Sequence, residues 1–171
     1  MAVLETERLI VRPLSEKDAD DYYDMMGNPN VMKLIPRSVM SRKESNHHLM
    51  GFVNADLNRS DTKAWAIETK LNHDFIGICA FLINAEGDHE IGYRLREKFW
   101  RNGFGTEIAK GLISFGFNHL NMDKITADVA VNNLNSVRIL EKFMTSKKVF
   151  FNASDNCYDR RYEVFRKDWL H

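Results

Sequence analysis

Residues 99–107 read Phe99-Trp100-Arg101-Asn102-Gly103-Phe104-Gly105-Thr106-Glu107, and this stretch decides the fold. It follows an alternating segment, 90–96, and precedes a segment, 106–120, with apolar residues at helical spacing. The first amides of a helix have no partner within the helix and carry partial positive charge. Glycines remove the Cβ atoms that would hold an anion away from such amides. The stretch therefore predicts either a seat for a phosphate or diphosphate or an ordinary glycine-containing turn.

Two other glycine-loop signatures fit this stretch less well. A Walker A loop ends in Gly-Lys-Ser/Thr, but no lysine follows Gly105. A dinucleotide-binding G-x-G-x-x-G would use Gly103 and Gly105, yet it meets Ile108 where a third small residue is required. Asp123 lies about 20 residues further on, as that fingerprint asks. It begins an expected strand rather than ending one, which weighs against a dinucleotide site.

The periodicity of the rest of the chain predicts a mixed α/β (α+β) sheet rather than repeated βαβ units. Strands are expected at 9–14, 63–69, 75–83, 90–96, 125–131, 149–152 and 158–167. Helices are expected at 15–27, 41–57, 106–120 and 133–143, with Asn28-Pro29-Asn30 as a break between the first two. No linker, repeat or low-complexity segment divides residues 1–171, so we expect a single domain.

The composition is typical of a globular protein that binds neither nucleic acid nor a membrane. The 24 basic and 24 acidic residues cancel, so no overall positive charge attracts a polyanion. The sequence shows no signal-peptide pattern and no apolar run of the roughly 20 residues that a membrane span needs. Two cysteines in no C-x-x-C pair, and six histidines without ligand spacing, predict neither a disulfide framework nor a metal site. We expect a cytoplasmic protein.

Residues 100–105 resemble the coenzyme A diphosphate motif, R/Q-x-x-G-x-G/A, of the GCN5-related N-acetyltransferase (GNAT) superfamily. Trp in the first position is typical of the ribosomal-protein N-terminal acetyltransferase (RimJ/RimL-like) branch, whose usual form is Y-W-G-x-G-Y-A-T-E. Other segments resemble the same branch in the same order: 5–14 (E-T-E-R-L-x-L-R-x-L), 90–93 (E-I-G-Y), 133–142 (N-x-x-S-x-x-x-L-E-K) and 158–169. The chain departs from the branch at Phe143-Met144-Thr145, where Leu-Gly-Phe is usual. Because that glycine would end a helix in a left-handed turn, we expect an altered helix end.

The resemblance implies a GNAT fold: a mostly antiparallel sheet of about seven strands flanked by about four helices. It implies direct transfer of acetyl from acetyl-CoA to a primary amine in a ternary complex, with a protein N-terminus, a polyamine or another small amine as acceptor. Residues 28–42 are expected to shape the acceptor groove. A monomer and a homodimer are both compatible with the sequence, and an idle acyl-CoA-binding regulatory module is the alternative function.

The resemblance also implies a set of residues that bind the cofactor: Leu95, Arg96, Arg101, Asn102, Gly103, Phe104, Gly105, Thr106 and Asn133. Leu95 and Arg96 belong to this set because, in this family, the pantetheine amides form hydrogen bonds with the backbone at the end of the strand expected at 90–96. Arg101 adds charge near a phosphate or is simply solvated. Asn133 is a helix N-cap, a pantetheine ligand or both.

Glu90 and Ser136 are the expected catalytic residues. Glu90 would remove the proton of the attacking amine, or it is a strand glutamate paired with Arg94. Asp159 and Glu68 are alternative bases. Ser136 would donate to the departing thiolate, or it satisfies a local backbone amide at the start of its helix.

Overall fold

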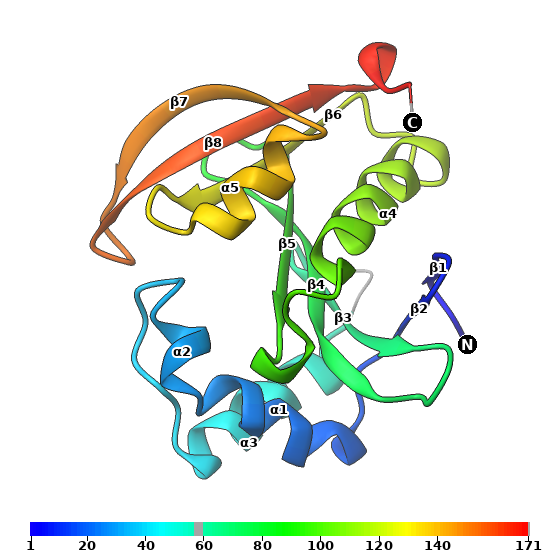
Figure 1. Cartoon of the computed structure of the whole chain (residues 1–171), viewed down its shortest axis with the longest axis vertical. Coiled ribbons are helices and arrows are strands. Elements are labelled where there is room, and N and C mark those ends of the chain that lie inside the picture. Colours follow the sequence, from blue (N-terminus) through cyan, green and yellow to red (C-terminus); the bar gives the residue numbers. More distant parts are fainter. Residues whose placement is uncertain (57–59, 171) are drawn as a thin grey trace.

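An eight-stranded sheet of order β1-β2-β3-β4-β5-β6-β8-β7 runs through the computed structural model, which describes residues 1–56 and 60–170 (Figure 1). The strands are β1 (Leu4–Glu5), β2 (Leu9–Arg12), β3 (Lys63–Thr69), β4 (Phe75–Ile83), β5 (His89–Leu95), β6 (Lys124–Ala130), β7 (Thr145–Asn152) and β8 (Cys157–Phe165). The α-helices are α1 (Ala19–Met26), α2 (Pro29–Met32), α3 (Arg42–Val53), α4 (Phe104–Asn118) and α5 (Leu134–Glu141). Short 3₁₀ turns lie at Glu16–Asp18, Glu97–Phe99 and Arg166–Asp168. Every strand pair is antiparallel except β5 with β6, so the expected mostly antiparallel α/β sheet is confirmed.

Several boundaries differ from the sequence-based expectation. The sheet has eight strands where about seven were expected. The strand that was not expected is β1, whose two residues are too few to show a period. The expected break at 28–30 instead starts helix α2, because the Asn28 side chain accepts from the Asn30 amide and Pro29 occupies the first turn. Helix α3 ends at Val53, before the expected end at Leu57, a residue that lies outside the described ranges.

The chain passes from α5 into β7 without a left-handed residue. Lys142 closes the helix in right-handed conformation, and the Met144 amide donates to the Leu140 carbonyl (2.8 Å). Strand β7 therefore begins at Thr145 rather than at the expected Val149. The altered helix end expected from Phe143-Met144-Thr145 is what the structure contains.

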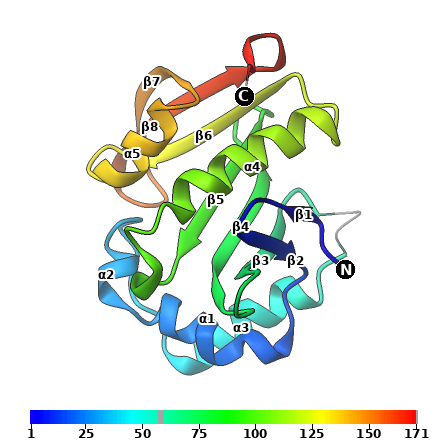
Figure 2. The same ribbon diagram turned by 45° about the vertical axis from the view of Figure 1, so that its right-hand side comes forward.

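The two faces of the sheet have separate cores. Helix α4 packs Ile108, Leu112 and Ile113 on one face, together with the odd-numbered residues of β5. Helices α1, α2 and α3 cover the other face around Tyr22 and Leu49. Figure 2 shows α4 crossing in front of the sheet, with α1 and α3 at the opposite end of the molecule from β7 and β8.

Strands β5 and β6 separate soon after they meet. In the described part of the chain they pair in parallel at one position, Glu90 opposite Thr126. The Thr126 hydroxyl donates to the His89 carbonyl (2.9 Å) and accepts from Asn84 Nδ2 (3.2 Å). At this point a side chain, rather than a backbone amide, bonds β6 to the carbonyl of β5. Beyond this point the sheet is open between the two strands, and the candidate site lies in the opening.

The end of β5 is held against β4 at Gly77. A Cβ atom built there would lie 2.1 Å from the Arg94 carbonyl oxygen, a backbone atom that cannot rotate away. We expect Gly77→Ala to lower the free energy of unfolding by about 3 kcal/mol or more. Gly51 is the matched control, because it lies in exposed α3 with nothing within 4 Å of its built Cβ. Gly51→Ala should stabilise by about 0.5–1 kcal/mol in urea denaturation; equal effects of the two changes would contradict this packing.

Candidate active site

Two adjoining cavities occupy the opening between β5 and β6. The larger, about 610 Å³, is bounded by the turn before α4, the end of β5 and the first turns of α5. The smaller, about 330 Å³, lies between α3, β4, β6 and the β7–β8 hairpin. The residues that line both are Leu34, Ile35, Tyr93, Arg94, Asn133 and Ser136. A molecule in one cavity is therefore in reach of a molecule in the other across these side chains.

The turn before α4 directs backbone amides into the larger cavity. Arg101 and Gly103 both have positive φ, 62° and 79°, and Gly103 is the N-cap of α4. Asn102 holds the turn by donating its side-chain amide to the carbonyls of Phe99 (3.2 Å) and Trp100 (3.0 Å). The first helical bond runs from the Glu107 amide to the Gly103 carbonyl (3.1 Å), so the amides of 103–106 precede it. Such a helix start fits a diphosphate.

The N-terminal hairpin fastens this turn from outside. Glu107 accepts from the Thr6 hydroxyl (2.5 Å), the Arg8 amide (2.7 Å) and Arg8 Nε (2.7 Å). Arg8 Nη1 also donates to the Asn102 carbonyl (2.9 Å), and its guanidinium lies 4.5 Å from the centre of the Phe104 ring. Burial raises the pKa of Glu107, but the bonds from Thr6 and Arg8 outweigh it and hold that pKa below its ordinary value. The carboxylate therefore stays ionised.

The free edge of β5 offers backbone groups to the opening. The Arg96 amide donates to the Ile76 carbonyl (2.8 Å), which makes the even-numbered residues of β5 the hydrogen-bonded partners of β4. The amides and carbonyls of Ile91, Tyr93 and Leu95 consequently point away from β4. One of them, the Leu95 carbonyl, accepts from the Trp100 indole (3.0 Å). Tyr93 and Leu95 can thus pair with an extended ligand.

Helix α5 brings Ser136 to the boundary between the cavities. The Asn133 side chain caps α5 by accepting from the Ser136 amide (3.4 Å). The buried Tyr93 hydroxyl faces Ser136; burial raises the pKa of Tyr93 to about 12, and Ser136 opposes that rise. Sequence reasoning missed Tyr93 as a wall of the site, although the inward face of the alternating strand contained it.

Glu90 has an unusual carboxyl group. Burial first, and then the negative charges of Asp128 and Asp159, raise the pKa of Glu90 to about 7, against the opposing effects of Arg161 and the Asp128 amide. Glu90 lines neither cavity, whereas Asp128 and Asp159 line the smaller one. The carboxyl therefore lies just behind the cavity wall.

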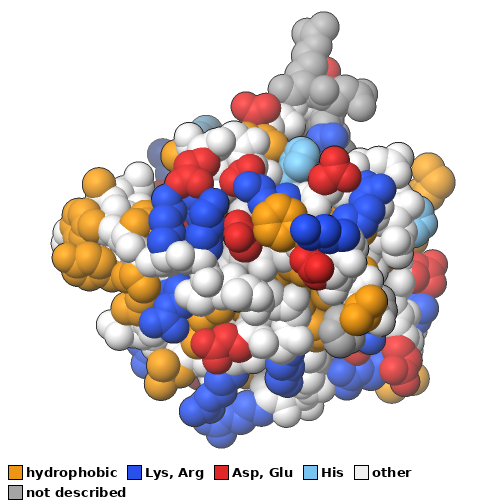
Figure 3. Space-filling model, turned by 90° about the horizontal axis from the view of Figure 1, so that it is seen from above, with side chains coloured by type: hydrophobic (Ala, Val, Ile, Leu, Met, Phe, Trp, Pro, Cys, Tyr) orange, Lys and Arg blue, Asp and Glu red, His pale blue; other side chains and the backbone are white. Residues whose placement is uncertain are grey.

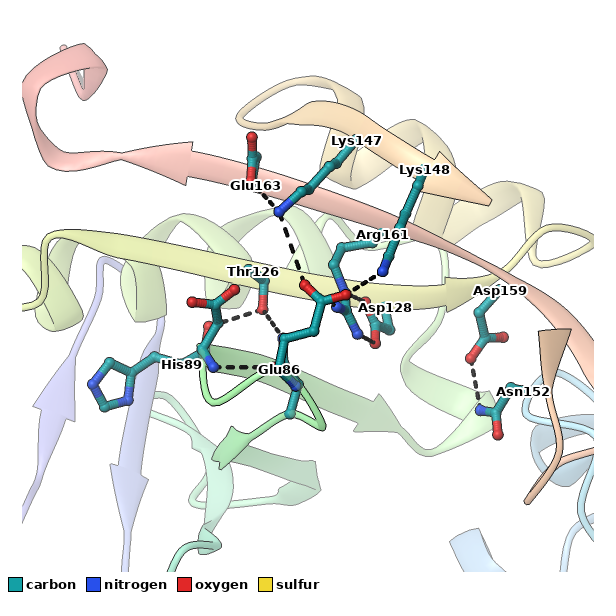
Figure 4. Close-up of polar contacts among 12 residues, drawn as sticks. Glu86, His89, Thr126, Asp128, Lys147, Lys148, Asn152, Asp159, Arg161 and Glu163 are labelled. Atoms are coloured by element: carbon teal, nitrogen blue, oxygen red, sulfur yellow. Dashed lines mark hydrogen bonds and ion pairs between the residues drawn. The ribbon is translucent and has the colours of Figure 1, made fainter. Parts of the chain in front are cut away.

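Figure 4 shows the charge network around Asp128, the residue whose negative charge raises the pKa of Glu90. Arg161 holds Asp128 through two bonds of 2.8 Å, and Glu86 binds Arg161, Lys147 and Lys148. Asp159, in contrast, accepts only from uncharged groups among the described residues, Asn152 Nδ2 (2.8 Å) and Cys157 Sγ (3.4 Å). Asp159 therefore lines the smaller cavity without a cationic partner among the described residues.

Seven of the nine expected cofactor residues line the larger cavity: Leu95, Arg101, Gly103, Phe104, Gly105, Thr106 and Asn133. Asn102 braces the turn from behind. Arg96, expected for its backbone, does not line this cavity: its amide donates to the Ile76 carbonyl (2.8 Å). Its guanidinium binds Asp21 (3.2 Å), Asp24 (3.0 Å) and the Phe75 carbonyl (2.8 Å). The alternative base Glu68 lines neither cavity and is bound to Arg12 and His73.

The face over β7 and β8 carries charges of both signs. Seen from above, acidic and basic side chains are interspersed over the β7–β8 face (Figure 3). In residues 1–56 and 60–170, no three His, Cys, Asp or Glu side chains are grouped as metal ligands. No helix in the same ranges has the length and apolarity to cross a bilayer.

Comparison with known proteins assigns the class of this site. The family model "Acetyltransferase (GNAT) domain" matches residues 8–143, most of the chain, which therefore belongs to the GNAT acetyltransferase family. The chain is an enzyme of the kind that uses acetyl-CoA. It is 28% identical over 167 residues to the uncharacterized N-acetyltransferase p20 of Bacillus licheniformis, covering 96% of this chain and 94% of that protein.

Two solved structures share the fold. An acetyltransferase (GNAT family) from Bacillus anthracis superposes with a TM-score of 0.83 at 22% identity, covering 96% of this chain and 99% of that one. RimL, the ribosomal L7/L12 alpha-N-protein acetyltransferase in complex with coenzyme A, gives 0.76 at 17% identity, covering 96% and 98%. At these identities the likeness establishes the fold alone.

Gly103 provides a direct test of the diphosphate seat. A side chain there would strain the positive φ, and its Cβ would lie 3.3 Å from Nη2 of Arg8, the residue that fastens the turn. We expect Gly103→Val to raise the Kd for CoA about tenfold or more in titration calorimetry. Gly87→Val is the control, since Gly87 has a similar φ of 81° in the β4–β5 turn with open space around it. Unchanged affinity in Gly103→Val, or equal losses in both, would contradict the assignment.

Proposed function

We propose that this enzyme acetylates an amine held in the smaller cavity, by direct attack on acetyl-CoA held in the larger one. The observation that carries the proposal is the shared wall of the cavities, where Tyr93, Arg94 and Ser136 separate the two spaces. In such an arrangement donor and acceptor bind at once, and proximity replaces a covalent acyl-enzyme.

The larger cavity fits coenzyme A by its donor set. The amides of residues 103–106, with Arg101 beside them, would hold the diphosphate. The free backbone edge at Tyr93 and Leu95, together with Asn133, would bind the pantetheine amides. Arg96 has a supporting role in this proposal, because its bonds to α1 fix the end of β5.

Glu90 serves as the general base. An alkyl amine with a pKa of roughly 10 is protonated at neutral pH and must lose a proton before it attacks. A carboxyl with a pKa of about 7 takes that proton far better than an ordinary glutamate. Since Glu90 lies behind the wall formed by Asp128 and Asp159, the proton reaches its carboxylate through a bridging water.

Ser136 serves as the donor on the thiol side. Bound acetyl-CoA supplies the acetyl group as a thioester, and its sulfur leaves as a thiolate. The Ser136 hydroxyl lies between the cavities, and its backbone amide is already satisfied by Asn133. The hydroxyl would donate to that thiolate, and the Tyr93 hydroxyl, which faces Ser136, would be a second donor nearby.

Thiol release from acetyl-CoA, measured over a panel of amino acids, peptides and polyamines, tests the proposed function. We expect amine-dependent release, and we expect Ser136→Ala to lower kcat about tenfold to a hundredfold while the Kd for CoA changes little. Ser146→Ala, an exposed change in β7, is the control. CoA binding without turnover of any amine would instead favour an idle acyl-CoA-binding module, and normal turnover in Ser136→Ala would leave that residue a structural role.

The raised pKa of Glu90 gives two pH signatures. The value of kcat/KM should rise as the pH passes about 7, and Glu90→Gln should lower it and flatten the profile. A folded-state pKa above the ordinary 4.5 means that ionisation destabilises the fold as the pH rises from 4.5 to about 7. Glu90→Gln should thus be more stable than the parent at pH 8, by up to roughly 3 kcal/mol, and equal to it at pH 4. The same stability difference at both pH values would contradict the shift.

A further inference from the structure

Arg94 is an enclosed cation without an anionic partner in the described structure. It projects from β5 toward α1, where Nη1 donates to the thioether of Met26 (2.9 Å). Its Nε atom is buried and makes no hydrogen bond, and no described carboxylate lies within 4 Å of the guanidinium. A thioether is a weak acceptor, so the charge is poorly compensated. The residue lines both cavities, and thus faces the space where an acceptor would bind.

The neighbours of Arg94 do not supply the missing charge. Burial raises the pKa of Tyr22 and lowers that of His48, so both side chains are neutral, and they bond to each other (2.6 Å). Asp155 attracts Arg94 but is already bound by Arg37 (3.0 Å) and Asn152 (3.2 Å). Burial accordingly lowers the pKa of Arg94 to about 10. A partner from outside the chain would restore the balance.

The smaller cavity is also lined by a carboxyl group, that of Asp159, which has no cationic partner among the described residues. Asp159 has 6% of its surface exposed and accepts only from uncharged side chains among the described residues. Asp128 beside it is neutralised by the two bonds from Arg161. Among the described residues, the lining of the smaller cavity therefore includes a guanidinium from β5 and a carboxyl group from β8 that lack ion-pair partners.

We propose that the acceptor is a small amine that also bears a carboxylate, an amino acid or a close analogue, with the carboxylate bound by Arg94 and the amine directed to Asp159. This rests on the proposed function and specifies its substrate class. The enclosed Arg94 disfavours a polyamine, whose second positive charge would meet it in a desolvated space. The volume of about 330 Å³ is near the lower end of ligand cavities, roughly 300–1,000 Å³. The Arg37–Asp155 ion pair, whose two residues line this cavity, joins the segment after α2 to the β7–β8 hairpin.

The test compares each of the twenty standard amino acids with its carboxamide, with spermidine as a third arm. Binding to the CoA-loaded protein is measured by calorimetry, and acetylation by thiol release from acetyl-CoA. We expect at least one acid to bind and react about tenfold to a hundredfold better than its amide. We expect Arg94→Met to abolish that preference in a folded protein that still binds CoA, Arg94→Lys to retain part of it, and the exposed α3 change Lys43→Met to retain all of it.

Binding and turnover separate the two proposals. Selective binding of an acid without acetylation would uphold the carboxylate site and refute the proposed function. Acetylation of amides or spermidine as readily as acids, binding of no acid at all, or a preference that survives in folded Arg94→Met would each refute the carboxylate site while leaving amine acetylation as measured.

Discussion

The parting of β5 from β6 is the constraint on which the rest of the site depends. The two strands meet at Glu90 and Thr126 and then diverge, so a sheet that is otherwise continuous exposes backbone groups in its interior. Buried amides and carbonyls without partners are costly, so backbone groups left open in this way are suited to bind a ligand. The free edge of β5 and the start of α4 open onto the same cavity. One opening in the sheet therefore provides the surface for an extended ligand with a negatively charged end.

The opening remains defined because other contacts fix its borders. Arg96 fastens the end of β5 to α1, and the Thr6 and Arg8 side of the N-terminal hairpin fastens the turn before α4 through Glu107. These ion pairs and hydrogen bonds join segments 72 to 101 residues apart in the chain. The side chains of Thr6, Arg8, Arg96 and Glu107 line neither cavity, but they hold in place the turn and the strand end that do.

The sequence predicted those features that lie within one short segment of the chain, and it missed those that depend on contacts between distant segments. The turn at 99–107, the alternation in 90–96 and the helix after Gly103 are local patterns, and the structure contains them at nearly the expected bounds. Helix α2 and strand β1 were missed because two to four residues cannot display a period. The environment of Glu90 was beyond prediction, since Asp128 and Asp159 approach it only after the strands assemble.

The environment of Arg94 could not be predicted from the sequence either. The sequence placed Arg94 on the same strand face as Glu90 and made an ion pair between them plausible. In the structure the guanidinium of Arg94 instead donates to Met26, and the two residues form no ion pair. The lack of a partner is a property of three-dimensional packing and leaves no trace in spacing. Conversely, Asn133 was open to two interpretations, and its capping bond to Ser136 is now observed while it also lines both cavities.

Amide hydrogen exchange with and without CoA addresses the central claim most directly, because it reads the backbone groups themselves. On addition of CoA we expect slower exchange at the amides of residues 103–106 and of Tyr93 and Leu95, with NAD⁺ producing no such change. Protection confined to other segments, or equal protection by NAD⁺, would contradict the account that the parted strands form a coenzyme A site.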